Sequence, residues 1–107
     1  MTSRVIVPLD GSHRASSAIR PAMALADQLG GVPVQAVSVV ADAGEQTERE
    51  QALNVALASQ GVSSAEVRVR VDTSATDGLL GLIGETPDAE VVMATHARGT
   101  IGQAVLG

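Results

Sequence analysis

Strand-like and helix-like segments alternate along the whole chain. Apolar or alternating runs occupy residues 4–9, 33–40, 66–71 and 91–94, and stretches with a helical spacing of apolar residues separate them. An alternation of this kind produces a parallel sheet with right-handed crossovers and helices on both faces. We therefore predict a single α/β domain over residues 1–107, with a doubly wound parallel sheet in three layers, similar to the flavodoxin and Rossmann architectures.

The polarity of each strand predicts its place in the sheet. Residues 5–9 (Val-Ile-Val-Pro-Leu) form a continuous apolar run, which is typical of a central strand buried on both faces. Pro8 cannot donate a hydrogen bond to a neighbouring strand, so we expect it at the strand's end. Residues 66–71 alternate strictly between charged residues and valine, which predicts an edge strand with one buried face.

Three helices are predicted between these strands. The first has Ser12 as its N-cap, but Pro21 lies well inside it, so we expect a kink there or a start later than Ser12. The second covers residues 45–60, and the third runs from Ser74 to about residue 85. The third carries three glycines at three-residue spacing, Gly78, Gly81 and Gly84, each costing about 1 kcal/mol relative to alanine in a helix. Either these glycines allow a close approach to a neighbouring element or this helix is weak.

The composition excludes several classes of function. The chain has no cysteine, which removes disulfides, thiol catalysis and thiolate metal sites. It has no aromatic residue that could stack on a ligand base, and its net charge of -5 argues against a general nucleic-acid binder. No apolar run approaches the ~20 residues of a membrane span, and strand-like sequence by Arg4 leaves no room for a signal peptide. We expect a cytoplasmic protein without a nucleic-acid or membrane partner.

Two strands end in polar turns that contain glycine. Residues 10–12 (Asp-Gly-Ser) follow the first strand, and residues 95–99 (Thr-His-Ala-Arg-Gly) follow the last one. In α/β sheets ligands bind beyond the carboxyl ends of the strands, where backbone N–H groups often hold phosphates. If these two strands are neighbours, their ends form a crevice, with His96 and Arg98 as further candidates for phosphate contact.

With both strand ends identified, the chain resembles the universal stress protein family. The resemblance covers the whole chain, from residues 4–12 (Arg-Val-Ile-Val-Pro-Leu-Asp-Gly-Ser) to Gly107. It implies a five-stranded doubly wound sheet ordered 3-2-1-4-5, a homodimer and a role in stress response. Many members bind ATP through a loop after strand four with the pattern G-x2-G-x9-G-[S/T]. On this sequence the three glycine positions of the pattern fall at Ala94, Ala97 and Gly107.

The resemblance also implies a binding site for an adenine nucleotide, such as ATP or AMP, with or without Mg. Asp10 would accept hydrogen bonds from the ribose hydroxyls, and the backbone of Val39 would read the adenine edge. The candidate binding residues are then Pro8, Leu9, Asp10, Val39, Ala94, Ala97, Arg98, Gly99 and Gly107.

Two departures from the family pattern leave alternatives open. Alanine replaces glycine at Ala94 and Ala97, and the methyl of Ala97 would stand where ribose or phosphate lies in binding members. If that position needs a left-handed conformation, alanine costs ~1 kcal/mol or more. The chain can therefore also be a homologue that binds no nucleotide and acts through dimerisation or a partner, or a regulatory domain of a larger polypeptide.

Other chemistries fit the sequence poorly, and we expect no enzyme. Asp10, Ser12 and His13 have the residue types of a catalytic triad, but they are nearly contiguous and no G-x-S-x-G elbow exists. Gly102 and Gly107 have P-loop spacing, yet the chain contains no lysine. Its two histidines are far apart, and no cysteine accompanies them as a metal ligand.

The end of the chain presents a misfit. Residues 91–94 are apolar enough for a central strand, and we expect nothing after them to cover the strand's outer side. We infer that the domain is incomplete at its C-terminal end, lacking a final helix and strand. A bare edge of this kind would be covered by another chain or by a swapped element.

Overall fold

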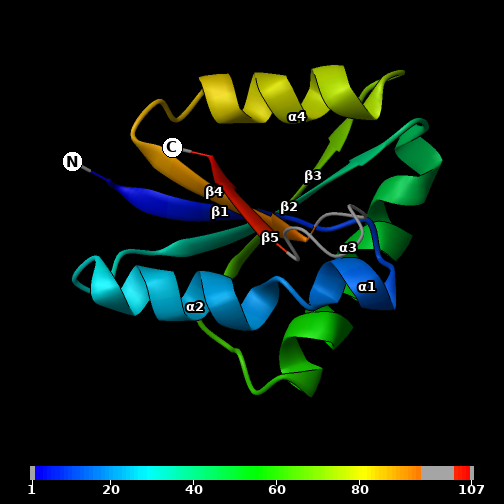
Figure 1. Ribbon diagram of the computed structural model, residues 1–107. Helices are drawn as coiled ribbons and strands as arrows, with labels where there is room; N and C mark the ends of the chain where they lie inside the picture. The colour runs from blue at the N-terminus through cyan, green and yellow to red at the C-terminus, as the bar shows by residue number, and fades with distance from the viewer. Residues whose placement is uncertain (1, 95–102, 107) are drawn as a thin grey trace.

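The computed structural model describes residues 2–94 and 103–106 of the chain. Strands and helices alternate along it as predicted (Figure 1). Their bounds are β1 Arg4–Pro8, α1 His13–Ser16, α2 Ile19–Gln28, β2 Val34–Val40, the short 3₁₀ helix η1 Ala43–Glu45, α3 Gln46–Ser59, β3 Glu66–Val71, α4 Ala75–Gly84, β4 Ala89–Ala94 and β5 Gln103–Leu106.

The sheet has the strand order β3-β2-β1-β4-β5. Strands β1 to β4 run parallel to one another. The doubly wound α/β fold with β1 in the interior and β3 at an edge is therefore confirmed. Val5, Ile6 and Val7 of β1 are fully buried, which is why this strand reads as an uninterrupted apolar run.

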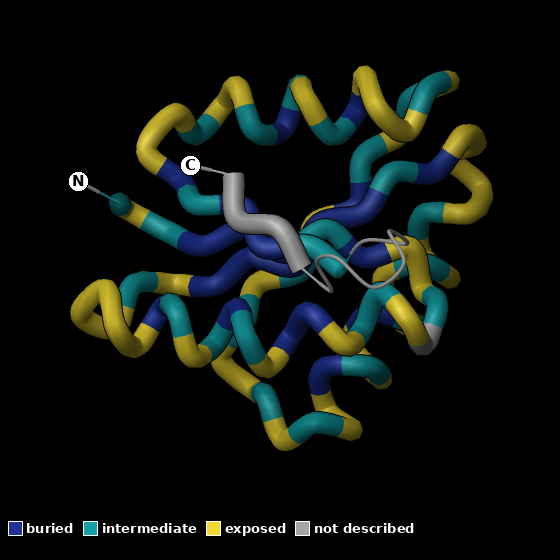
Figure 2. The backbone as a smooth tube through the Cα atoms, viewed as in Figure 1, coloured by how far each residue is buried: buried dark blue, intermediate teal, exposed yellow. Residues whose placement is uncertain are grey.

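Helices cover both faces of the sheet and form the three layers that we predicted. α4 lies over one face, while α1, α2 and α3 lie over the other (Figure 1). Successive side chains of a strand point to opposite faces, so Val5 and Val7 join the core beneath α2 and α3, whereas Ile6 joins the core beneath α4. Buried residues are concentrated along the central strands between these layers (Figure 2).

The outer side of β4 corrects one expectation from the sequence. Residues 103–106 form β5, which pairs antiparallel with β4 from Val91 to Ala94. The expectation that nothing after residue 94 covers this side is therefore wrong, and the bare edge on which we based association does not exist there. β5 occupies the fifth place in the expected strand order, but it runs against the four parallel strands.

The first helix begins where its N-cap predicts and is then interrupted. The Ser12 hydroxyl accepts a hydrogen bond from the Ala15 N–H at 3.1 Å and caps α1. α1 ends at Ser16, and α2 starts at Ile19, so that Pro21 lies in the first turn of α2. Because the first N–H groups of a helix have no partner within that helix, proline is tolerated there. The break between α1 and α2 therefore explains how Ser12 can cap a helix although Pro21 lies inside the predicted helical segment.

The glycines of α4 do not all have the same role. A Cβ atom at Gly78 would lie 2.7 and 2.9 Å from the two methyl carbons of Val39, so the missing side chain lets α4 pack closely on β2. At Gly81 the nearest atoms belong to the flexible guanidinium of Arg70, and at Gly84 no atom of the described residues lies within 4 Å of the Cβ position. Close approach thus explains Gly78, the glycine nearest the carboxyl ends of the strands.

Candidate functional site

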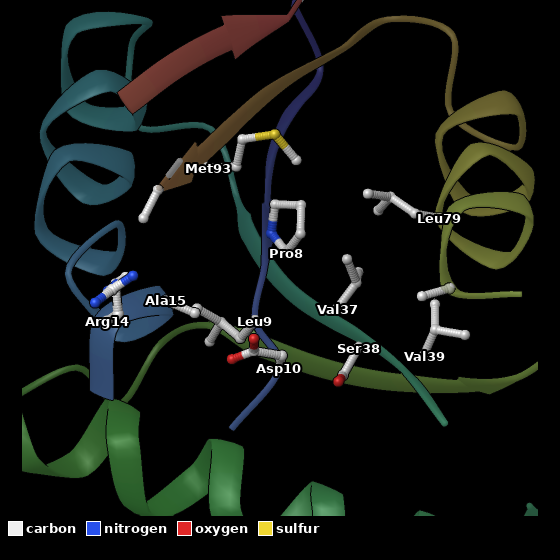
Figure 3. A pocket seen from close by; sticks show the side chains of 12 residues that line it. Pro8, Leu9, Asp10, Arg14, Ala15, Val37, Ser38, Val39, Leu79 and Met93 are labelled. Carbon is white, nitrogen blue, oxygen red and sulfur yellow. The ribbon is translucent and has the colours of Figure 1, made fainter. Parts of the chain in front are cut away.

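A pocket of about 190 Å³ lies at the carboxyl ends of β1, β2 and β4. This is the edge of the sheet at which parallel α/β folds bind ligands. The volume is smaller than the ~300–1,000 Å³ of most ligand sites, so the pocket has room for only part of a ligand of ordinary size. Figure 3 shows the pocket between α4 on one side and α1 on the other.

The apolar wall of the pocket comes from three strands and one helix. Val37 and Val39 project from β2 toward α4, since residues two apart on a strand share a face. Leu79 extends from α4 toward the side where Pro8 and Met93 lie (Figure 3). Aliphatic groups and a thioether on facing sides can hold a flat ring without an aromatic partner.

A carboxylate lies at the polar end of the pocket. The Asp10 carboxylate accepts a hydrogen bond from the Ser12 N–H at 2.8 Å, across a turn in which Gly11 has a φ of +87°. The Ser12 side-chain hydrogen bond lowers the pKa of Asp10 below its ordinary value; partial burial opposes this, and the Ser12 N–H and the positive charge of Arg49 add to the lowering. Asp10 is therefore an ionised acceptor at neutral pH, suited to ligand hydroxyl or amine hydrogens.

Arg49 of α3 reaches the strand ends from below the sheet. Its Nη1 donates to the Ser38 hydroxyl at 2.7 Å, and Ser38 is only 3% exposed. The side chain also passes the turn after β1, since its Nε lies 3.6 Å from the position that a Cβ atom would take at Gly11. One arginine thus bonds to β2 and lies beside the turn that follows β1.

The structure brings together five of the nine candidate binding residues. Pro8, Leu9, Asp10, Val39 and Ala94 all line the pocket, although they come from three separate strands or strand ends. The other four, Ala97, Arg98, Gly99 and Gly107, lie outside the described residues, as does His96.

Seven further residues line the pocket and were not among the candidates. They are Arg14, Ala15, Val37, Ser38, Ala75, Leu79 and Met93. Val37 and Met93 each lie two positions along a strand from other residues of the α4 face, so strand alternation could have identified them. Ala75 and Leu79 are four apart and share a face of α4, but how that helix crosses the sheet is a tertiary property.

Within the described residues there is no group of three or more histidine, aspartate or glutamate side chains that could hold a metal ion. The helices in this part of the chain also lack the length and apolar character that crossing a membrane requires. Comparisons with protein-family models, with curated proteins and with solved structures found no match.

Proposed function

We propose that the protein binds an adenine nucleotide at the pocket beside Asp10. One observation carries this proposal: Asp10 and Val39, which the family resemblance assigns to the two ends of adenosine, line the same pocket. The pocket also lies at the edge of the sheet where α/β folds bind such ligands.

The chemistry of the pocket suits the two halves of a nucleoside. The apolar wall of Val37, Leu79 and Met93 would hold the base, and the Asp10 carboxylate would accept hydrogen bonds from the ribose hydroxyls. The phosphates would extend out of the pocket, since its volume is small. Arg14 lines the mouth and supplies a local positive charge, which matters because the net charge of the chain is -5.

Titration calorimetry with ATP tests this proposal through Asp10→Ala. The substitution removes one or two hydrogen bonds to a charged acceptor, which corresponds to about 1–3 kcal/mol of affinity. Asp27→Ala is the matched control, because Asp27 is an exposed aspartate of α2 that does not line the pocket. We expect Asp10→Ala to weaken ATP binding about 5- to 150-fold and Asp27→Ala to leave it unchanged. Equal affinities for the two variants would contradict the proposed site.

We also propose that the protein acts in the cytoplasm and binds the nucleotide without turning it over. The resemblance implies, in addition, a role in stress response and assembly as a homodimer. Sedimentation equilibrium measures the assembly directly, since the mass of one chain is 10.8 kDa.

A further inference from the structure

We propose that Arg49 is a positioning residue that makes the pocket prefer a ribonucleotide to a 2′-deoxyribonucleotide. The inference rests on the proposed function and adds to it the sugar class that the site selects. It follows from the way in which Arg49 fixes the turn that carries Asp10.

β1 and β2 are still paired at the residue before Asp10, because the Leu9 N–H donates to the Val37 carbonyl at 2.7 Å. The turn follows directly, and Gly11 in it has a φ of +87°. The Arg49 Nε lies 3.6 Å from the position that a Cβ atom would take at Gly11, and the Arg49 Nη1 donates to the Ser38 hydroxyl on β2. The Arg49 side chain is thus held on β2 beside the turn that carries Asp10.

Arg49 shares a hollow with three acidic residues, Asp10, Glu45 and Glu48. Removing its guanidinium would leave the repulsion among these residues unopposed by this charge, which would favour a different orientation of the Asp10 side chain. The Ser12 side-chain hydrogen bond is the largest cause of the lowered pKa of Asp10, and the charge of Arg49 adds a smaller lowering. Arg49 therefore acts mainly on the orientation of the Asp10 carboxylate, which also accepts the Ser12 N–H hydrogen bond.

The orientation of Asp10 matters for the sugar of the ligand. A ribose presents two neighbouring hydroxyls, and one carboxylate can accept hydrogen bonds from both only when it is held in a fixed position. A 2′-deoxyribose offers one hydroxyl fewer, so its binding depends less on how Asp10 is held. A change that lets the Asp10 side chain move should therefore weaken binding of the ribonucleotide more than binding of the deoxyribonucleotide. General damage to the pocket should weaken binding of both equally.

Titration calorimetry with ATP and dATP on Arg49→Met measures this difference. We expect the wild type to bind ATP more tightly, and the ATP/dATP affinity ratio to fall about tenfold in Arg49→Met, the equivalent of one hydrogen bond to a charged group. Arg20→Met is the matched control: it removes an exposed arginine of α2 that does not line the pocket, and should keep the wild-type ratio. Arg49→Lys, which retains the charge, should restore part of the ratio.

A second variant keeps the inference testable if Arg49→Met folds poorly. Ser38→Ala removes the hydroxyl that Arg49 bonds and should lower the same ratio, and adding Arg49→Met to it should produce little further change. Carbon-detected NMR titration of Asp10 without nucleotide should also give a higher pKa in Arg49→Met than in the wild type.

The outcomes separate the two proposals. If the wild type binds neither nucleotide, the proposed function is wrong. If the wild type binds ATP but Arg49→Met leaves the ATP/dATP affinity ratio unchanged, because binding of both nucleotides is weakened equally or not at all, the proposed role of Arg49 is wrong. The proposed nucleotide site is then unaffected.

Discussion

At the scale of single residues, Gly78 has no room for a side chain against β2. A methyl group there would meet Val39 at 2.7 Å and the Asp72 Cβ at 3.0 Å, so α4 or β2 would have to move. Val39 also lines the pocket, so the same movement would alter the site. A glycine that costs helix stability is thus explained by the contact that its missing side chain permits.

Gly78→Ala should therefore destabilise the protein, although alanine is the better helix former. Overpacking of this kind costs about 1–3 kcal/mol, against about 1 kcal/mol gained in helix propensity. Gly84→Ala is the matched control, because no atom in the described part of the chain lies within 4 Å of its Cβ position, and it should stabilise the fold by up to about 1 kcal/mol. Urea denaturation measures both changes. Two variants of equal stability would show that the contact with Val39 does not constrain α4.

Only some of the residues that line the pocket could be predicted from the sequence. Asp10 could be found because it directly follows an apolar strand, and Val39 because the family resemblance assigns it a role. The contact between Arg49 and Ser38 could not be found, since the two residues are 11 positions apart and meet only when α3 folds back over the sheet. Nothing in the spacing of Leu79 indicates which strand ends α4 will face.

At the scale of elements, an ion-pair cluster joins β3 to the C-terminal end of α4. Glu85 accepts from Arg68 at 2.8 Å and from Arg70 at 2.7 Å, and these hydrogen bonds, that from Arg68 most strongly, lower the pKa of Glu85. Arg68 and Arg70, two of the alternating charged residues of β3, therefore bind Glu85. Charges at a sheet edge also discourage pairing with another strand.

The lowered pKa of Glu85 makes the contribution of this cluster depend on pH. A carboxylate whose pKa is lower in the folded state than in the unfolded state stabilises the fold when the pH lies above the ordinary pKa of that carboxyl, which is 4.5 for Glu85. That stabilisation is lost as the pH falls through the folded-state pKa. The stability difference between wild type and Glu85→Gln should therefore be present at pH 7 and disappear on acidification below 4.5. Salt should reduce it as well, because the cluster is exposed.

Denaturation of both proteins across this pH range checks the prediction. Glu50→Gln, at an exposed position of α3, controls for the loss of one negative charge. A stability difference for Glu85→Gln that is the same at every pH, or that Glu50→Gln reproduces, would contradict it.

Elements also differ in how well the sequence predicts them. β3 could be predicted over its full extent, because strict alternation sets both its period and its exposed face. β5 could not, since four residues (Gln-Ala-Val-Leu) carry no recognisable period, and their pairing with β4 depends on the chain reversing direction.

At the scale of the whole molecule, the fold follows from the alternation of elements and the site from the strand order. β1 lies between β2 and β4, so the ends of three strands converge at one edge, where the turn at Asp10 comes close to Val39 and Ala94. The order 3-2-1-4 could be anticipated from strand polarity and from the resemblance. The dimensions of the pocket could not, because they depend on how closely α4 approaches the sheet.

We proposed above that an adenine nucleotide binds at the edge of the sheet beside Asp10. Amide NMR spectra of the ¹⁵N-labelled chain, recorded during titration with ATP, test this binding residue by residue. We predict that the largest shift changes occur at Leu9, Asp10, Val39 and Leu79, with little change at Gly31 and Asp88, which lie outside the pocket. Changes concentrated elsewhere, such as along the α3 surface around Val55, or no change at millimolar ATP, would contradict the claim.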